Sequence, residues 1–440
     1  MALVRPFRGI TYNSDRFDDL GSIVTPPYDV ISPGGQEGFY SAHPYNVIRL
    51  ELGRTGPGDT NSNNRYTRAA RTFSDWLTEG ALVRGTRPCF YVTAQDYQAG
   101  RLKRTRWGII ARVRIEDEGS GVVLPHEQTF SAHKADRLKL MEACRAQFSQ
   151  IFSVYQDPER AVEEVFSYCR ALSPKISFKA PDGSIHRMWV VSDPEVIVTV
   201  EDLFRDKTLY IADGHHRYET ARNYRDMVRA GRVQAVDGPH EYVMMYLSSM
   251  DGEGLTILPY HRLLSAGPPL DDSSLADRLS RWFSVEHQTS DRLDPDSLEA
   301  SLAVSGKAGP SFAVFTGAGR CLLLRLKPGA CEEMDSGLHP ALRRLDVQVL
   351  SELVFGKALG LTPEDLGDDA LFQFDSSIES CLAKVRAGQA RAAFLLNPTP
   401  IEDVRDVARA GLVMPRKSTY FHPKVITGLV LNPLDDDGRD

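Results

Sequence analysis

The sequence predicts a mixed α and β fold of the α+β type, built from more than one domain. Its 440 residues exceed the roughly 150 residues of a typical single domain. Its 42% hydrophobic and 25% charged residues are typical of globular proteins. Short apolar runs that indicate strands also alternate along the chain with longer segments of helical periodicity.

The first part of the chain is expected to alternate strands and helices. Pro26 and Pro27 forbid helix near the start and favour loops and short strands. A helix is predicted from Asn63 or Asn64, which can cap it, to Gly80, where a left-handed end is expected. The further elements predicted here are strands at 89–97 and 105–115, helix 134–147, strand 151–155, helix 159–172, a hairpin of 176–179 with 185–191, strand 208–212, helix 215–230, and strands 241–247 and 255–264.

A linker is predicted at 266–272, because Pro268 and Pro269 follow Gly267 and adjacent prolines cannot continue regular structure. The sequence therefore predicts an N-terminal mixed α/β unit over 1–265 and a C-terminal α+β domain over 273–440. In the second domain we expect helices at 275–283, 340–359, 376–386 and 401–410, and strands at 312–315, 321–326 and 392–396.

Charge and composition exclude several classes of protein. A formal net charge of -7 disfavours a general nucleic-acid binder, which needs a basic surface. Apolar runs such as 242–247 are far shorter than the roughly 20 residues that cross a bilayer, and no secretory leader precedes Arg5. The six cysteines form no C-x-x-C pair. We therefore expect a cytoplasmic protein that binds neither nucleic acid nor membrane.

The most informative segment joins a strand to a helix. A buried strand is expected to end at Asp213, Gly214 allows a sharp turn, and His215 and His216 begin a helix whose first N–H groups can bind a phosphate. Arg217 can add a charged fork to the same anion. A turn and helix cap without further function is the alternative interpretation of these residues.

Adjacent histidines point about 100° apart on a helix, so His215 and His216 are not expected to bind one metal ion together. One imidazole could contact the phosphoryl group or its leaving oxygen. Asp213 could orient that imidazole or hold Mg²⁺. We predict that Arg217→Ala nearly abolishes turnover.

A second candidate cluster lies at 46–53, where apolar alternation predicts a strand with Arg49 and Glu51 on a common face. Arg49 could bind a substrate carboxylate, and Glu51 could accept an ammonium group or a hydroxyl proton. The alternative is an exposed, salt-bridged strand face.

A third cluster follows Pro125, which places His126 and Glu127 on a loop. Glu127 is the first candidate for a general base, and His126 for a substrate contact. A surface pair between Glu127 and Lys134 is the alternative.

The fourth cluster is a loop at 414–423 that is dense in cationic and hydroxyl side chains. Lys417, Ser418 and Thr419 lie between two prolines and can bind an anion. If this loop folds over the first unit, it could close on the phosphates of a ligand bound at the Gly214 turn and exclude water from them. An ordinary polar crossing loop is the alternative.

Several of these segments together resemble a known family. The chain is similar along nearly its whole length to the bacterial and archaeal DUF1015 family, and its Asp213 to Arg217 segment resembles the phosphate-binding signature of ParB/sulfiredoxin-like proteins. The segments that carry the first resemblance are 26–32, 45–53, 124–127, 213–217 and 414–421. The second group includes free serine kinases that use ADP or pyrophosphate. The resemblance implies a ParB/sulfiredoxin-like core in which Asp213, Gly214, His215, His216 and Arg217 contact donor phosphates.

The resulting hypothesis is a phosphotransferase that moves a phosphoryl group to a small hydroxyl amino acid, most simply L-serine, with Mg²⁺ and with pyrophosphate, ADP or ATP as donor. The acceptor, the donor and the choice between Glu127 and Glu51 as base stay open, as does a homodimer. The alternative is a nucleotide-binding or slowly hydrolysing regulatory protein. No P-loop, dinucleotide-binding, hydrolase-elbow or zincin motif is present.

Overall fold

The structure is a computed structural model that describes residues 1–231, 238–267, 270–288, 293–317 and 320–435. The chain forms two compact units. The first comprises 1–125, 129–256 and the chain from 423 onward, and the second comprises 126–128 and 257–422. The mixed α/β class predicted from the sequence is confirmed. The domain boundary between 265 and 273 stays a prediction.

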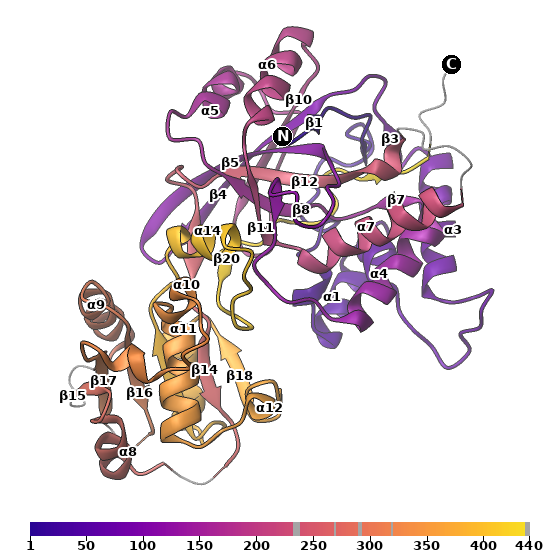
Figure 1. Cartoon of the computed structure of the whole chain (residues 1–440). Helices are drawn as coiled ribbons and strands as arrows, with labels where there is room; N and C mark the ends of the chain where they lie inside the picture. Colours follow the sequence, from indigo (N-terminus) through magenta and orange to yellow (C-terminus); the bar gives the residue numbers. More distant parts are fainter. Residues whose placement is uncertain (232–237, 268–269, 289–292, 318–319, 436–440) are drawn as a thin grey trace. The chain divides into compact units, whose positions relative to one another are not determined.

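The first unit is built around a mixed sheet with nine strands among the described residues (Figure 1). Most neighbours are antiparallel, while β11 with β6 and β12 with β8 are parallel pairs. In sheet order the strands are β6 (Val123–Leu124), β11 (Leu209–Asp213), β8 (Ile151–Tyr155), β12 (Tyr242–Ser249), β5 (Leu102–Arg114), β4 (Phe90–Ala99), β10 (Ile185–Val191) and β9 (Ile176–Lys179), with β1 (Val4–Arg5) paired to β5.

Helices and two small ladders complete this unit. α3 packs on α4, and α4 packs on α7. The helices are α1 (Pro33–Ala42), α2 (Ile48–Glu51), α3 (Arg65–Thr78), α4 (Ser131–Cys144), α5 (Ala161–Val165), α6 (Pro194–Arg205) and α7 (His215–Ala230), with short 3-10 turns η1 (Tyr28–Val30), η2 (Ser167–Ala171) and η3 (Pro239–Glu241). The ladders pair β2 (Ile10–Tyr12) with β3 (Leu82–Arg84), and β7 (Ala146–Gln147) with β21 (Asn432–Pro433).

Local sequence signals account for most of these elements. Asn64 caps α3 through a reciprocal capping box with Thr67, which satisfies backbone donors at the helix start. Gly100 has a φ of +57° between β4 and β5, a conformation that glycine adopts without strain. The core includes buried side chains from both sheet and helices, among them Ile211 of β11 and Tyr218 of α7.

The strand predicted at 46–53 is wrong, because this segment contains the short helix α2. The Asn46 side chain accepts a hydrogen bond from the Ile48 N–H at 2.9 Å, which starts a turn. The N–H of Leu52 then bonds to the carbonyl of Ile48. Val47 and Ile48 are fully buried, so the apolar residues pack as expected but with helical geometry.

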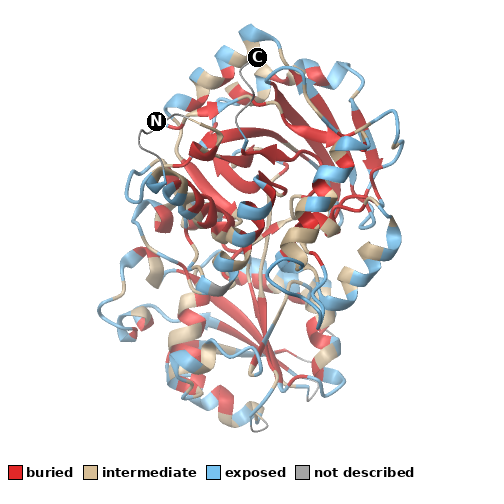
Figure 2. Ribbon diagram, turned by 90° about the vertical axis from the view of Figure 1, so that its right-hand side faces the viewer, coloured by how far each residue is buried: buried red, intermediate tan, exposed pale blue. Residues whose placement is uncertain are grey.

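The second unit has an antiparallel sheet, whose six strands among the described residues are, in order, β15 (Phe283–Gln288), β17 (Cys321–Leu326), β16 (Ser311–Phe315), β19 (Ala392–Leu396), β14 (His261–Leu264) and β18 (Phe372–Asp375). Figure 2 shows the central strands as buried. The shorter β13 (Thr256–Leu258), at the division of the units, pairs with β20 (Tyr420–His422).

The helices of the second unit are α8 (Asp272–Leu279), α9 (Pro295–Gly306), α10 (Pro340–Arg343), α11 (Asp346–Val349), α12 (Pro363–Leu366), α13 (Ile378–Arg386) and α14 (Ile401–Arg409), with a 3-10 turn η5 (Ala330–Glu333) and a π-helix η6 (Leu350–Ala358). The single helix predicted at 340–359 is broken at Leu345, which has an extended conformation with ψ 128°. Within the described ranges, every helix is too short or too polar to cross a bilayer.

Candidate phosphate site

The site is built on the turn from β11 into α7, whose bounds match the predicted helix (Figure 1). Gly214 is the N-cap residue and has a φ of +91°. A Cβ atom at this position would lie 2.8 Å from Nε of Arg217. Glycine is therefore required both by the left-handed backbone and by the arginine that folds back over the turn.

Asp213 connects two cations at the end of β11. Its Oδ2 accepts a hydrogen bond from Nη2 of Arg217 at 2.6 Å, and its Oδ1 accepts one from Nζ of Lys424. The three side chains are between 8% and 12% exposed. Opposite charges held this close in a partly desolvated site attract each other more strongly than on an open surface.

Arg217 also ties α7 to the neighbouring strand, because Nη1 donates to the carbonyl of Gln150 at 2.5 Å. Gln150 precedes β8, and its side-chain Nε2 donates to the carbonyl of Ile426 at 2.9 Å. Thr427 pairs with Thr25 through two backbone hydrogen bonds. These contacts fix residues 424–427 beside the turn and so position the Lys424 ammonium group.

Asp29 is the second carboxylate of the site. It lies in η1, directly after Tyr28, whose ring is buried under the Arg137 guanidinium group at 4.2 Å. Asp29 is an exposed residue, but the protein packed around it raises the pKa of its carboxyl group, and the Asp213 carboxylate raises that pKa further. Arg217 and Lys424 act in the opposite direction. Four charged groups of opposite sign therefore interact around one turn.

The two histidines at the start of α7 differ in their surroundings. His215 is buried. Nε2 of His216 accepts a hydrogen bond from the Phe130 N–H at 2.9 Å, and the two rings stack with centroids 5.9 Å apart. Because Nε2 is an acceptor in this contact, the His216 proton lies on Nδ1 when the ring is neutral. His216 thus positions the loop before α4 in addition to any contact with a ligand.

Glu51 and Arg49 do not share a face, because α2 replaces the predicted strand. The Glu51 carboxylate is 3% exposed, accepts from Ser149 Oγ at 2.8 Å and lies 3.4 Å from Arg137 Nη1. The Arg49 guanidinium group donates to the carbonyls of His43 and Tyr40, both at 2.9 Å. Each group is thus held by contacts within the first unit, and their substrate roles stay predictions.

The other candidate residues belong to the second unit. His126 is buried there, and its Nε2 lies 3.2 Å from Oγ1 of Thr419. The Ser418 hydroxyl donates to the carbonyl of Pro415 at 2.5 Å, and the Lys417 ammonium group lies 5.0 Å from the centre of the Tyr260 ring. The roles of these residues and of Glu127 stay predictions. Lys134, considered above as a partner of Glu127, pairs with Glu219 at 2.7 Å.

Asp29 and Lys424 are site residues that the sequence reasoning did not select. Asp29 falls inside the 26–32 segment that resembles the DUF1015 family, but no spacing rule gives it a role. Lys424 lies just beyond the 414–421 segment, and its contact with Asp213 depends on tertiary structure alone. The signal that could have found them is a charged residue without an assigned role that lies within, or next to, a segment resembling the DUF1015 family.

Metal ligands are sparse in this arrangement. No group of three or more His, Cys, Asp or Glu side chains that could hold a metal ion occurs within the described ranges. The Asp213 carboxylate is nevertheless a hard oxygen donor, and Mg²⁺ in phosphate-handling sites is commonly bound by one or two carboxylates plus the phosphates of the substrate. Asp213 is therefore the carboxylate of this arrangement that would hold a Mg²⁺ ion arriving with a phosphorylated ligand.

The fold and the site define a mixed α/β protein with a cluster of charged side chains at the start of α7. The chain belongs to the family described as "Protein of unknown function (DUF1015)", whose model matches residues 4–348. No curated protein matches the sequence.

The solved structures to which the chain shows similarity include free serine kinase in complex with AMP (12% identity, 68% of this chain and 83% of that chain, TM-score 0.31). A second is a conserved hypothetical protein from Pyrococcus furiosus (14% identity, 69% of this chain and 88% of that chain, TM-score 0.32). A third is SbnI with a C-terminal truncation from Staphylococcus aureus (10% identity, 74% of this chain and 87% of that chain, TM-score 0.35).

Proposed function

We propose that this protein is a phosphotransferase that moves a phosphoryl group from pyrophosphate or a nucleotide to the hydroxyl group of a small amino acid, most simply L-serine. The observation that carries the proposal is the contact of Asp213 with both Arg217 and Lys424 at the start of α7. Backbone donors, two cations and two carboxylates meet at this turn, which is the set of groups that phosphoryl transfer requires.

The phosphates of the donor would bind at the start of α7, where the helix dipole and the first N–H groups favour an anion. Arg217 and Lys424 would share their charge between Asp213 and the phosphate oxygens. Such a site accelerates transfer by holding the reacting groups in line and by stabilising negative charge, and it needs no covalent enzyme intermediate.

Asp29 is the general base that we favour over Glu127 and Glu51. Its raised pKa brings the carboxyl group closer to the working pH, which makes it a better acceptor for the proton of a hydroxyl group. Glu51, by contrast, is buried against Arg137 and Ser149. Asp29 is also an exposed residue that a small amino acid could approach.

Mg²⁺ belongs to this proposal as a partner of the donor phosphates. Asp213 is the residue that would hold it, and the ion would neutralise charge on the phosphate oxygens. Whether or not Mg²⁺ is bound, Asp213 also fixes the positions of Arg217 and Lys424.

The second candidate function is a nucleotide-binding or slowly hydrolysing regulatory protein. The same turn favours this alternative, because a helix start with Arg217 and Lys424 can bind phosphates without any acceptor. The two functions differ in one respect. A transferase consumes the donor rapidly only when a suitable hydroxyl compound is present.

The experiment is a matrix of donors and acceptors followed by phosphorus NMR. Pyrophosphate, ADP and ATP are each incubated with serine, threonine or homoserine and Mg²⁺. A new phosphomonoester signal that requires the acceptor supports the proposal, and its absence from every combination contradicts it. Asp29→Asn should lose the signal, while Asp18→Asn, which changes an exposed aspartate of the same unit, should keep it.

A further inference from the structure

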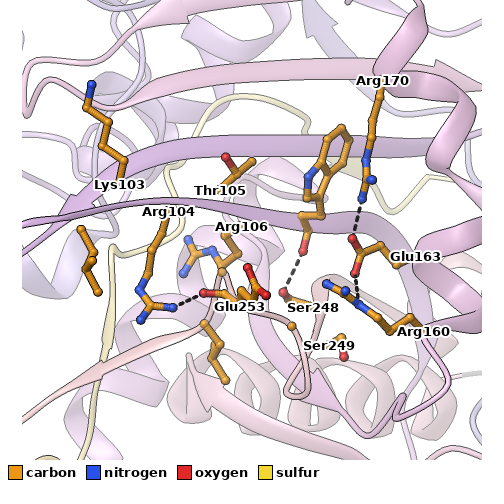
Figure 3. A pocket seen from close by; sticks show the side chains of 15 residues that line it. Lys103, Arg104, Thr105, Arg106, Arg160, Glu163, Arg170, Ser248, Ser249 and Glu253 are labelled. Atoms are coloured by element: carbon orange, nitrogen blue, oxygen red, sulfur yellow. Dashed lines mark hydrogen bonds and ion pairs between the residues drawn. The ribbon is translucent and has the colours of Figure 1, made fainter.

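Arginine and carboxylate side chains meet in two different settings within the first unit. In a cavity of about 680 Å³ beside β5, Glu163 lies between Arg160 and Arg170 (Figure 3). Both arginine side chains are more than half exposed, and such surface pairs contribute little to stability. Arg137 on α4 is different, because its side chain is 6% exposed and pairs with two carboxylates. Burying these charges is costly, so the pairing calls for a local reason.

The Arg137 guanidinium group is held through all three of its nitrogen atoms. Nη1 donates to the backbone carbonyl of Glu51 at 2.7 Å and lies 3.4 Å from Oε1 of the same residue. Nε and Nη2 donate to Oδ2 of Asp136 at 2.8 and 2.5 Å. The Ser149 hydroxyl donates to Oε1 of Glu51 at 2.8 Å. These contacts with α2 and α4 fix the plane of the guanidinium group.

The guanidinium group lies against the ring of Tyr28, with 4.2 Å between its carbon atom and the ring centre. A cation at this distance from an aromatic ring is attracted to it. The ring is buried, and burial raises the pKa of its hydroxyl group to about 12. Tyr28 begins η1, and the Ile31 N–H bonds back to its carbonyl at 3.3 Å. A fixed ring therefore fixes the turn that carries Asp29.

The Asp29 carboxylate has no clamp of its own. Among the described residues, no side chain forms a hydrogen bond or an ion pair with it. Apart from burial, its pKa responds to the charges of Asp213, Arg217 and Lys424. The position of the carboxylate is thus set by the η1 backbone, and Arg137 influences it through that backbone.

We propose that Arg137 is a positioning residue for Asp29 and acts through the ring of Tyr28. The inference rests on the proposed function. In that reaction the substrate hydroxyl oxygen bonds to phosphorus, its proton passes to Asp29, and the bond between this phosphorus and the rest of the donor breaks. Glu51 contributes indirectly, because it holds Arg137. A displaced η1 would move the carboxylate from the hydroxyl group and leave the groups at the start of α7 in place.

Steady-state kinetics of Arg137→Met test the proposal, with the donor and acceptor that give the strongest signal in the NMR matrix. We expect kcat to fall about tenfold to a hundredfold, the effect of a small misplacement of a reacting group. KM for the donor should stay near the parent value, and the acid limb of the pH-rate profile should stay in place, because the change is one of position. Tyr28→Phe, which keeps the ring, should keep kcat, whereas Tyr28→Leu should lower it as Arg137→Met does.

Arg225→Met is the matched control. Arg225 is also a buried arginine on a helix, with 3% exposure. It donates to the Ile115 carbonyl and to the carboxylate of its neighbour Asp226, both at 2.8 Å. Its loss should lower Tm about as much as Arg137→Met does but leave kcat unchanged. Equal losses of kcat in the two variants would reduce the effect to the general loss of a buried arginine and overturn the proposal.

Hydrogen exchange separates this inference from the proposed function. The Val30 and Ile31 amides, which bond back within η1, should exchange faster in Arg137→Met and unchanged in Arg225→Met. Unchanged exchange in Arg137→Met overturns the positioning role even if transfer occurs. Absence of transfer in the parent protein overturns the proposed function, and the catalytic purpose of the positioning with it. An unaltered kcat or a shifted acid limb in Arg137→Met also overturns the proposal. If that variant does not fold, Tyr28→Leu takes its place in each measurement.

Discussion

Lys424 donates a hydrogen bond to Oδ1 of Asp213 across 211 positions of the sequence. This contact brings a cation from the last described segment to the strand end that precedes α7. Asp213 therefore organises the turn through Arg217 on one oxygen and Lys424 on the other.

Gly214→Ala should destabilise the protein by about 2 kcal/mol or more. An L residue in the left-handed region costs roughly 1–2 kcal/mol, and the added Cβ would press on the Arg217 guanidinium group. Urea unfolding measures the loss. Gly231→Ala is the matched control at the other end of α7, where φ is -86°, and should change stability far less. Equal losses in the two variants would contradict the requirement for glycine at the turn.

Asp29→Asn should abolish phosphoryl transfer and raise stability at neutral pH. The raised pKa of Asp29 means that the folded state holds its proton more tightly than the unfolded state does. Ionisation of Asp29 at neutral pH therefore opposes folding, and this cost disappears below the ordinary aspartate pKa. Unfolding measured from pH 3 to pH 8 should show a gain for Asp29→Asn that shrinks as the pH falls. A variant less stable than the parent at pH 7 would contradict the electrostatic argument.

Lys424→Met should move the acid limb of the pH-rate profile to higher pH. Lys424 lowers the pKa of Asp29, so removing its charge raises that pKa, and a higher pH is needed to obtain the basic carboxylate. The profile of kcat/KM for the transfer reaction measures the shift. Lys139→Met, on α4, is the control for loss of a lysine and should keep the parent profile. An acid limb that stays in place would exclude Asp29 as the titrating base.

Asp346→Asn should stabilise the second unit above pH 7. Burial raises the pKa of Asp346 to about 7, while Asn397 and the Ser311 backbone oppose the shift. The favourable contribution of this carboxyl group is present below its ordinary pKa near 4 and is lost as the pH rises through about 7. The gain of Asp346→Asn over the parent should therefore grow between pH 4 and 7 and then level off. Asp277→Asn, on the exposed side of α8, should show no such dependence.

Much of the fold could be predicted from short-range signals. The bounds of α7, β8, β9, β10, β17 and β19 agree with the sequence interpretation, because each is either a periodic segment or a compact apolar run bounded by polar or turn residues. The Asp213 to Arg217 turn was recognisable for the same reason. Gly214 follows a compact apolar strand and precedes a helical pattern.

The strand prediction at 46–53 was wrong because the four apolar residues of this segment fit both strand and helix periodicity. The Asn46 side chain favours the helix, because its oxygen accepts a hydrogen bond from the Ile48 N–H. The contact of Lys424 with Asp213 could not be predicted, since no local rule indicates where a chain returns after a second unit. Asp29 was visible in the sequence, but its raised pKa depends on neighbours brought together by folding.

The sequence of the first unit is interrupted by residues 257–422 of the second unit, and this arrangement has a consequence for biosynthesis. During translation, the ribosome must produce residues 257–422 before Lys424 and the strand that pairs with Ala146 and Gln147 emerge. A nascent chain that stops before this return would carry Asp213 and Arg217 without their third partner. The phosphate binding that we propose at the turn should therefore develop late in synthesis, after the inserted unit has left the exit tunnel.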